Sequence, residues 1–254
     1  MSNVIVTGAS RGIGFATVEA LAGRGDRVVA IARFDRGSEH VAKIAEPLAL
    51  DLSLTADAER ALEASEAMIG PCDAMVLAAG VAEHAPIEEV DAARIDRHFA
   101  INVRAPLLMC RDFAERCKAR GAPGSIVMVA STLGIAPAKR TSVYAATKGA
   151  VIAMTKALAV ELAPIGVRVN AIAPGIVDTA MTRALRLERG EAMPSGDELL
   201  RRENEQMEAF ARLHPSGRVG TAGGVAAGIL YLLDAPDAVG TVLVLDGGLT
   251  AGSA

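Results

Sequence analysis

The N-terminal residues of the chain carry the pattern of a β-α-β unit with glycines at its first turn. Residues 3–7 form a short apolar run with β-branched side chains, which is typical of a buried strand. Residues 15–22 have the spacing of a helix that ends near Gly23 and Gly25, and residues 27–32 form a second apolar run. This order predicts two strands joined by a helix, which is the building unit of an α/β sheet.

The turn between the first strand and the helix has the sequence Gly8-Ala9-Ser10-Arg11-Gly12-Ile13-Gly14. Glycine allows tight turns and lets a ligand approach the main chain closely. The start of the following helix offers unpaired N–H groups and the positive end of the helix dipole, and both favour a phosphate. The spacing differs from the commoner Gly-x-Gly-x-x-Gly. In this strand–turn–helix context we expect the turn to bind the pyrophosphate of a dinucleotide.

Strand-like and helix-like segments alternate along the rest of the chain. Further strands are expected at 47–50, 74–78, 125–130, 167–173 and 242–245, and further helices at 56–68, 91–120 and 142–162. This predicts one α/β domain over 1–254, a Rossmann-type doubly wound parallel sheet of about seven strands with helices on both faces. Ligands bind at the carboxyl ends of the strands in such sheets. The residues expected at that edge are Gly8, Gly80, Ser131 and Pro174.

Tyr144 and Lys148, together with Ser131, are the leading catalytic candidates. A tyrosine and a lysine four residues apart on a helix share one face, so the ammonium can lie near the phenol. A free phenol has a pKa of about 10, and a nearby cation lowers that value by favouring the phenolate. With a hydroxyl to hold a substrate oxygen, this set predicts proton transfer at a carbonyl or alcohol oxygen. The spacing alone also occurs by chance on helices that carry a solvated lysine.

The end of the second strand indicates which dinucleotide is bound. An acidic side chain there accepts hydrogen bonds from the ribose of NAD, whereas an arginine pairs with the additional phosphate of NADP. The chain has Ala32 and Arg33 at that position, and Arg11 lies within the glycine turn. We therefore favour NADP(H) over NAD(H), while two ordinary surface arginines and the nearby Asp35 leave NAD open.

Four further motifs follow the glycine turn. They are Asp51-Leu52 after the third strand, Asn102 with Ser131, Tyr144 and Lys148, the segment Pro174-Gly175-Ile176-Val177-Asp178-Thr179, and Asp246-Gly247-Gly248. With the glycine turn, these motifs resemble the short-chain dehydrogenase/reductase family, and in particular its 3-oxoacyl-acyl-carrier-protein-reductase-like subgroup, over essentially the whole chain. The resemblance implies an oxidoreductase that acts on a CH–OH group with a nicotinamide dinucleotide.

The resemblance also implies roles for the matched residues. The catalytic tetrad is Asn102, Ser131, Tyr144 and Lys148, with Asn102 and Lys148 in a water-linked proton relay. The residues implied around the cofactor, beyond the glycine turn and Arg33, are Asp51, Leu52, Ala79, Gly80, Tyr144, Lys148, Pro174, Gly175, Val177 and Thr179. Relatives commonly form tetramers, so a homotetramer is expected.

One segment departs from the family pattern. The chain has Leu77-Ala78-Ala79-Gly80 where the family usually has Asn-Asn-Ala-Gly. Ala79 and Gly80 keep the small-residue turn that lets a cofactor approach, but two side-chain amides that brace the central sheet are lost. We expect lower stability or looser cofactor geometry rather than loss of activity.

Residues 180–215 interrupt the alternation of strands and helices and are rich in arginine and glutamate. Two interpretations stay open: a lid over the substrate, or a solvated, ion-paired helical insertion. The residues expected to line the substrate pocket are Leu133, Ile135, Pro137 and Met181, with Val81 and His84 as weaker candidates and Lys139 and Arg140 near the rim. This mostly apolar lining is compatible with an acyl thioester, a cyclic ketone, a steroid-like molecule or an oxo-acid.

The sequence therefore predicts an NADP(H)-dependent oxidoreductase that interconverts a ketone and a secondary alcohol. The alternatives are a catalytically inactive NADP(H)-binding regulator and an NAD-dependent alcohol dehydrogenase. A formal net charge of -4 does not favour nucleic acid. The three cysteines lack the spacing of metal ligands, so no metal is expected. No secretory leader or uninterrupted apolar span is expected, which predicts a cytoplasmic protein without membrane contact.

Overall fold

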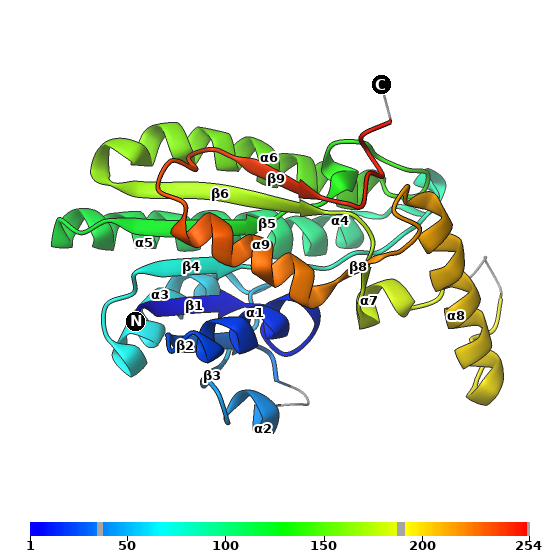
Figure 1. The fold of residues 1–254 in the computed structure, drawn as a ribbon, viewed down its shortest axis with the longest axis horizontal. Coiled ribbons are helices and arrows are strands. Elements are labelled where there is room, and N and C mark those ends of the chain that lie inside the picture. The colour runs from blue at the N-terminus through cyan, green and yellow to red at the C-terminus, as the bar shows by residue number, and fades with distance from the viewer. Residues whose placement is uncertain (35–37, 187–190, 253–254) are drawn as a thin grey trace.

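Seven parallel strands form the central sheet of the protein, in a computed structural model that describes residues 1–34, 38–186 and 191–252. The strand order is β3-β2-β1-β4-β5-β6-β9 (Figure 1). The strands are β1 (Asn3–Thr7), β2 (Arg27–Ala32), β3 (Glu46–Ala49), β4 (Ala74–Leu77), β5 (Gly124–Val129), β6 (Val167–Pro174) and β9 (Val242–Leu245). A separate two-stranded parallel pair consists of β7 (Val177–Asp178) and β8 (Gly220–Thr221). The predicted parallel sheet of about seven strands is confirmed.

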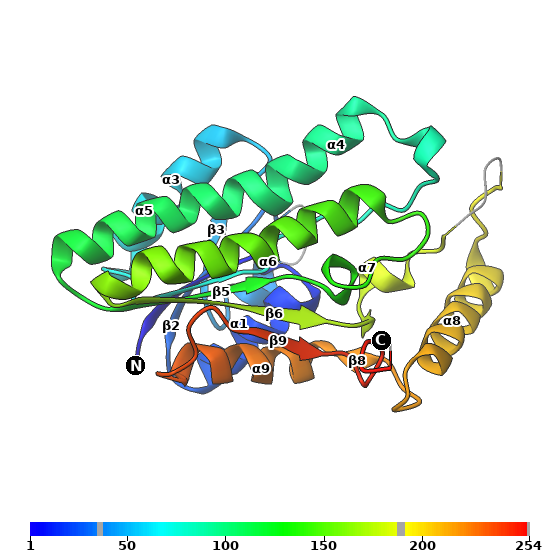
Figure 2. The same cartoon turned by 90° about the horizontal axis from the view of Figure 1, so that it is seen from above.

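Helices cover both faces of the sheet, as predicted (Figure 2). One face carries α3 (Thr55–Ile69), α4 (Ala92–Phe99), α5 (Ala105–Arg120) and α6 (Ser142–Leu162). The other face carries α1 (Gly12–Gly23) and α9 (Ala222–Asp234). The shorter α2 (Ser38–Val41) lies beside β3, and α7 (Ala180–Arg183) and α8 (Gly196–Leu213) extend beyond the carboxyl edge of the sheet.

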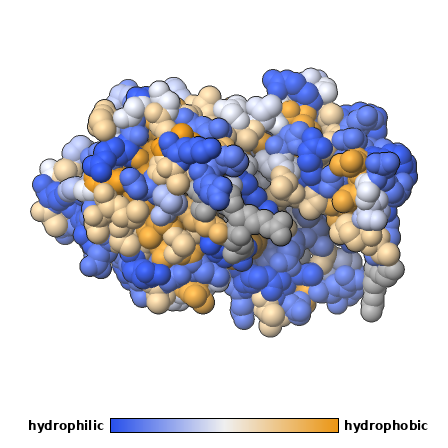
Figure 3. All heavy atoms as spheres, turned by 90° about the horizontal axis from the view of Figure 1, so that it is seen from below, coloured by the Kyte–Doolittle hydropathy of each residue, from blue (hydrophilic) through white to orange (hydrophobic). Residues whose placement is uncertain are grey.

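Burial on both faces explains the continuous apolar runs of the strands. In β1, Ile5 belongs to the hydrophobic core under α3, α5 and α6, whereas Val4 and Val6 belong to the core under α1 and α9. Since successive side chains of a strand point to opposite faces, a strand covered on both sides must be apolar at every position. Figure 3 shows the outer surface from below, where hydrophobic residues lie among hydrophilic ones.

The glycine turn is tighter than the sequence pattern indicated, because α1 begins at Gly12 rather than near residue 15. Gly8 has a φ of +68°, and a Cβ on it would lie 2.8 Å from the backbone of Ala79. A Cβ on Gly14 would overlap the carbonyl oxygen of Gly8. The first turn of α1 therefore lies directly against the end of β1, and its N-terminus faces the carboxyl edge of the sheet.

The helical region predicted at 91–120 contains an irregular segment. Its helix begins after Asp91, whose side chain accepts a hydrogen bond from the backbone N–H of Arg94 at 2.7 Å. A π-helical turn over Ala100–Arg104 then separates α4 from α5 and contains Asn102. Such bulges occur frequently at functional sites, and the helical periodicity of the sequence gave no sign of this one.

Helix α9 was not predicted, because Gly223, Gly224 and Gly228 weaken the helical pattern of its sequence. The structure gives Gly228 a packing role. A Cβ on it would lie 2.7 Å from Cδ1 of Leu245 and 2.8 Å from Cδ1 of Ile172. The glycine therefore lets α9 approach the sheet closely at β6 and β9.

The segment Ser142–Ile165, which comprises α6 and the short turn after it, is long and apolar enough to cross a membrane. Core helices of soluble proteins meet the same criterion when they are mostly buried, whereas the apolar window of this segment is 28% buried. One face of α6 packs on the sheet, with Val151 and Ala159 buried in the core under it. We therefore interpret α6 as a helix that packs on the sheet through one face.

We predict that Gly14→Ala destabilises the protein by about 1–3 kcal/mol, because its methyl group would overlap the Gly8 carbonyl and force the backbone apart. Thermal unfolding measures the change. Gly223→Ala in α9 is the matched control, since nothing lies within 4 Å of its Cβ position. The control should be neutral or stabilising by up to about 1 kcal/mol. A Gly14→Ala variant as stable as the wild type would show that the turn can relax.

Candidate active site

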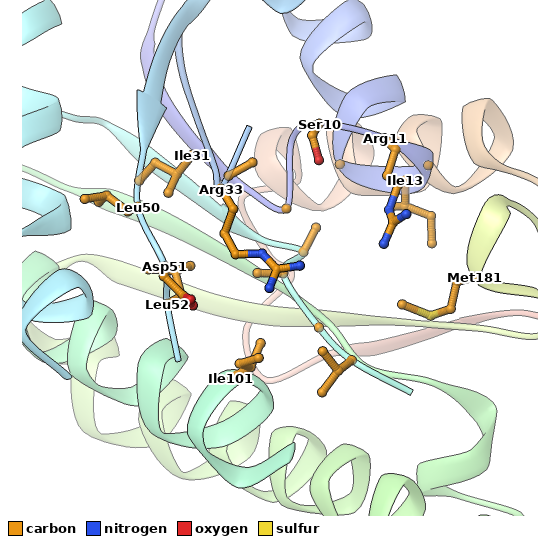
Figure 4. A pocket seen from close by; sticks show the side chains of 18 of the residues that line it. Ser10, Arg11, Ile13, Ile31, Arg33, Leu50, Asp51, Leu52, Ile101 and Met181 are labelled. Atoms are coloured by element: carbon orange, nitrogen blue, oxygen red, sulfur yellow. The ribbon is translucent and has the colours of Figure 1, made fainter. Parts of the chain in front are cut away.

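A cleft lies along the carboxyl edge of the sheet, between the β1–α1 turn and the ends of the neighbouring strands (Figure 4). The predicted cofactor residues that line it are Gly8, Ser10, Arg11, Gly12, Ile13, Gly14, Arg33, Asp51, Leu52, Ala79, Gly80 and Thr179. Pro174, Gly175 and Val177 lie on the segment that leads to Thr179 but do not line the cleft. Tyr144 and Lys148, which were also predicted to contact the cofactor, do not line it either. The structure thus brings together motifs that are spread over more than half of the sequence.

Two arginines extend into the cleft from different elements. Figure 4 shows Arg11 reaching in from the glycine turn and Arg33 from the end of β2. Both side chains are exposed to solvent, so neither is committed to the core. Ala32 supplies no acidic group at the end of β2, and Asp35 lies outside the described residues. The arrangement can therefore receive a phosphate group at this end of the cleft.

Asp51 is held at the same end by its neighbours. Its backbone N–H donates to the Asp57 carboxylate at 2.7 Å, and its own carboxylate accepts from the N–H of Ser53 at 2.9 Å. The hydrogen bond from Asp51, followed by that from Arg60, lowers the pKa of Asp57 below its ordinary value. Leu52 is buried beside them. These contacts fix the loop after β3 as one wall of the cleft.

Side chains from other elements hold the turn at Ala78–Gly80, where the chain lacks the two asparagines of the family pattern. The backbone N–H of Ala79 donates to Oγ1 of Thr7 at 3.0 Å. Asn102 accepts from the N–H of Val81 at 2.9 Å and donates to its carbonyl at 3.0 Å. Side chains from β1 and from the π-helical turn therefore brace this segment from both sides.

Ser131, Tyr144 and Lys148 meet beyond the end of β5. Ser131 is buried directly after the strand, and its hydroxyl hydrogen-bonds to the Tyr144 side chain. The Lys148 ammonium lies 5.7 Å from the centre of the Tyr144 ring and donates to the carbonyl of Val129 at 2.6 Å. The four-residue spacing on α6 thus produces the predicted proximity of ammonium and phenol.

The pKa of the phenol differs from the expectation that Lys148 lowers it. Burial raises the pKa of Tyr144 to about 12, and the hydrogen bond with Ser131 only partly opposes that shift. Burial also lowers the pKa of Lys148 to about 8, because the low-dielectric surroundings disfavour the ammonium. Desolvation therefore outweighs the attraction between the two groups, and Tyr144 holds its proton at neutral pH.

The side-chain amide of Asn102 is bonded to Val81 and Thr147 and not directly to Lys148. The water-linked relay between Asn102 and Lys148 stays a prediction. The Asn102 amide donates to Oγ1 of Thr147 at 3.0 Å, and that hydroxyl donates to the carbonyl of Tyr144 at 2.8 Å. Gly80 lies between the two groups, since a Cβ on it would be 3.3 Å from Asn102 Oδ1 and 3.6 Å from Lys148 Nζ. Asn102 therefore connects the Gly80 turn to α6.

A second hollow, which adjoins the start of α6, contains some of the predicted substrate residues. Leu133 and Pro137 line it together with Lys139 and Arg140. Ile135 does not line it, and its side chain is exposed. Met181 instead points into the cofactor cleft (Figure 4). Leu133, Pro137, Lys139 and Arg140 thus share one hollow, and Ile135 and Met181 lie outside it. A substrate role for these residues stays a prediction.

Several site residues were missed by sequence reasoning. Ser53, Ala78, Ile101 and Ala180 line the cofactor cleft, and Thr147 holds Asn102 in place. Their residue types carry no distinctive pattern, so only the fold reveals their position. Gly134 also has a packing role, because a Cβ on it would lie 2.6 Å from the carbonyl carbon of Lys148.

Within the part of the chain that the structure describes, no cluster of three or more His, Cys, Asp or Glu side chains could hold a metal ion. Cys72, Cys110 and Cys117 are buried and unbonded to one another. Burial raises the pKa of Cys72 and of Cys110 to about 12. These thiols therefore behave as small apolar residues, as the sequence indicated.

Comparison with known proteins gives a consistent result. Residues 2–190 match the family model described as short chain dehydrogenase. Human L-xylulose reductase is 40% identical over 71% of this chain and 74% of its own, and pig carbonyl reductase [NADPH] 2 is 34% identical over 97% and 96%. The solved 3-ketoacyl-(acyl-carrier-protein) reductase from Brucella melitensis complexed with NADH has a TM-score of 0.86 and 30% identity, covering 98% of both chains.

We predict that the buried Lys148 makes the protein more stable as the pH rises from about 8 toward 10.5. At pH values between about 8 and 10.5, Lys148 binds a larger fraction of a proton in the unfolded chain than in the folded protein. The free energy of unfolding of the wild type, minus that of Lys148→Met, should therefore increase over this range. Tyr144 is present in both proteins, so its own titration cancels.

Urea denaturation at several pH values measures this difference. Lys156→Met is the matched control, because Lys156 is exposed on the same helix and is hydrated in both states. Its difference from the wild type should not follow the pH. A flat profile for Lys148→Met as well would show that the ammonium is not desolvated.

Proposed function

The chain belongs to the short chain dehydrogenase family, and on that premise we propose that it is an NADP(H)-dependent oxidoreductase that interconverts a ketone and a secondary alcohol. The observation that carries the proposal is the meeting of Ser131, Tyr144 and Lys148 at the carboxyl edge of the sheet, next to the glycine-lined cleft. A proton donor and a hydride-carrying cofactor at one edge are what ketone reduction requires.

The residues present fit a dinucleotide. Gly8 and Gly14 carry no Cβ at the positions where one would collide with neighbouring backbone, so the turn can lie close against the end of β1. The N-terminus of α1 opens into the cleft. A Cβ on Gly12 would lie 3.3 Å from Cγ2 of Thr179, so the two walls of the cleft come close there. When bound, the nicotinamide supplies or accepts the hydride.

The chain's own residues account for the proton. Because the pKa of Tyr144 is about 12, the phenol is protonated at neutral pH and can donate to the oxygen of a ketone. The Ser131 hydroxyl, already bonded to the phenol, orients that oxygen and stabilises its developing negative charge. Lys148 supplies positive charge 5.7 Å from the ring and is in reach of the cofactor side of the site. The protonated phenol is the form that reduction of a ketone requires.

Arg11 and Arg33 support NADP(H) as the preferred cofactor. Arg33 extends into the cleft from the end of β2, where the second ribose of a dinucleotide lies in this type of fold, and Arg11 extends into it from the glycine turn. A relative is named as an NADPH enzyme, whereas a solved neighbour holds NADH, so the family uses both. The preference for NADP(H) therefore depends on these two side chains.

We extend the proposal to the surroundings of the site. The protein is a single domain in which residues 180–215 act as a lid over the substrate. Helices α7 and α8 of this segment lie beyond the edge of the sheet where Thr179 lines the cleft. Residues 187–190 of the segment lie outside the described chain.

We also propose a cytoplasmic homotetramer. Exposed Leu107 of α5 and Val160 of α6 offer apolar contacts for association, and analytical ultracentrifugation showing a monomer would exclude the tetramer.

We predict that Tyr144→Phe abolishes ketone reduction and leaves the affinity for NADPH nearly unchanged, because only the proton donor is removed. Turnover is followed by the loss of reduced cofactor, and binding by its fluorescence. Tyr231→Phe is the matched control, because Tyr231 is the other tyrosine of the chain and its side chain is 62% exposed. Near-normal turnover of Tyr144→Phe would contradict the mechanism. NADPH binding without turnover in the wild type would favour the inactive regulator instead.

We predict that Arg33→Gln and Arg11→Gln each weaken NADPH binding by about ten- to one-hundred-fold, because each removes a charge-assisted hydrogen bond to the phosphate. The affinity for NADH should change little. Titration of each variant with both cofactors measures the two effects. Arg111→Gln, on the outer side of α5 and paired with Asp112, is the control. Equal losses for NADH and NADPH would contradict recognition of the phosphate, and a wild type that prefers NADH would favour the NAD-dependent alternative.

A further inference from the structure

A cluster of basic side chains lies where two walls of the active-site region leave the cofactor cleft. His84 follows Gly80 and Val81, which line the cleft, and Arg186 follows Thr179 and Met181, which line it too. Arg140 lies on the rim of the neighbouring hollow, and its backbone carbonyl accepts from the N–H of Ala85 at 2.9 Å. The three side chains influence one another electrostatically, and we call them the basic cluster.

Helix α8 fixes the position of Arg186. The guanidinium stacks on the ring of Phe210 at 4.8 Å, and Phe210 is itself buried. Gln206, one turn earlier on α8, donates to the carbonyl of Thr182 at 2.9 Å and to that of Ala184 at 3.2 Å. The chain leading to Arg186 is therefore tied to α8 at several points, and the guanidinium is presented in a defined place.

Arg186 has no counter-charge of its own among the described residues. No carboxylate there forms an ion pair with the Arg186 side chain, whose pKa is lowered by burial and by Arg140. The adjacent acidic residue, Glu83, is already bound by Arg94 at 3.2 Å and by Arg97 at 2.8 Å. The positive charge of Arg140 adds to that of Arg186, because like charges close together repel each other. A bound anion would supply the counter-charge that Arg186 lacks.

His84 adds a second sign of an absent partner. Its Nδ1 atom is buried and has no hydrogen-bond partner among the described residues. Burial, followed by the charges of Arg186, Arg140 and His98, lowers the pKa of His84 to about 4, so the ring is neutral. A buried polar atom without a partner costs free energy. A neutral ring can donate one hydrogen bond to an anion held by the arginines.

We propose that the basic cluster of His84, Arg140 and Arg186 binds an anionic group of the substrate, so that the enzyme reduces a ketone which also carries a carboxylate or a comparable anion. The inference rests on the proposed function, because it assigns the substrate class of that same site. Arg186 supplies the planar fork that suits an oxyanion, and Phe210 holds the fork in place. Helix α8 then has a role in recognition, because its Phe210 holds Arg186.

Two matched pairs of ketones test the inference. Levulinate and methyl levulinate differ by the carboxylate charge, and acetonylphosphonate and its dimethyl ester differ by the phosphonate charge. We expect the wild type to prefer at least one acid over its ester by about ten-fold or more in kcat/KM. The pair with the larger preference identifies whether a carboxylate or a phosphonate-like group is recognised.

In Arg186→Gln, kcat/KM should fall for the acid and change little for its ester. The ratio of the two kcat/KM values should therefore drop by about ten-fold or more. Arg186→Lys keeps the charge without the fork and should retain part of the preference. Arg201→Gln is the matched control, because Arg201 lies exposed on α8 and pairs with Glu198 and Glu205. Its ratio should equal that of the wild type.

The outcomes separate this inference from the proposed function. Equal use of acid and ester by the wild type, or an unchanged ratio in Arg186→Gln, would overturn the basic cluster as an anion site while the reductase remains. If no ketone is turned over, the proposed function fails. Ligand-observed NMR on the protein with NADP⁺ then decides the inference. Acid binding that is lost in Arg186→Gln supports it, and binding without preference for the acid overturns it.

Discussion

The close contact between the turn after β5 and helix α6 is the constraint on which the catalytic group depends. Gly134 meets the backbone of Lys148 so closely that any Cβ would lie 2.6 Å from its carbonyl carbon. Ser131 leads into this turn, and Tyr144 lies one helical turn before Lys148 on the facing helix. The contact therefore brings the serine hydroxyl to the phenol and lets the ammonium reach the carbonyl of Val129 at 2.6 Å. If the two backbones were farther apart, Ser131 would not reach Tyr144 and Lys148 would not reach the carbonyl of Val129.

Burial then decides the protonation states in this arrangement. The protein keeps the proton on Tyr144 and weakens the hold of Lys148 on its own proton, and desolvation is the larger cause in both cases. Groups with shifted pKa values that share one cleft are characteristic of functional sites. The same reasoning applies to His84 and Arg186, which form a second group of perturbed side chains on the substrate side. One edge of the sheet thus combines a proton donor, a cofactor cleft and a basic cluster.

The departure at Leu77 and Ala78 leaves this segment braced by side chains from other elements. Thr7 accepts the N–H of Ala79, and Asn102 binds both backbone groups of Val81. Asn102 reaches this place because the π-helical turn between α4 and α5 carries it to the Gly80 segment. These backbone contacts support our expectation that the site stays active. They also give Asn102 a bracing role that a list of catalytic motifs does not contain.

Local sequence determined the elements whose pattern is short-range. The apolar runs of β1 and β2, the helix over Ser142–Leu162 and the spacing of Tyr144 and Lys148 follow from periodicity and residue type alone. The pattern missed α9, because the glycines that weaken its helical signal are needed for packing on Leu245 and Ile172. Only the tertiary structure decided which groups meet, such as Thr147 with Asn102 and Arg186 with Phe210. It also decided the pKa of Tyr144, because desolvation depends on what surrounds a group in space, and no local pattern of residues records that.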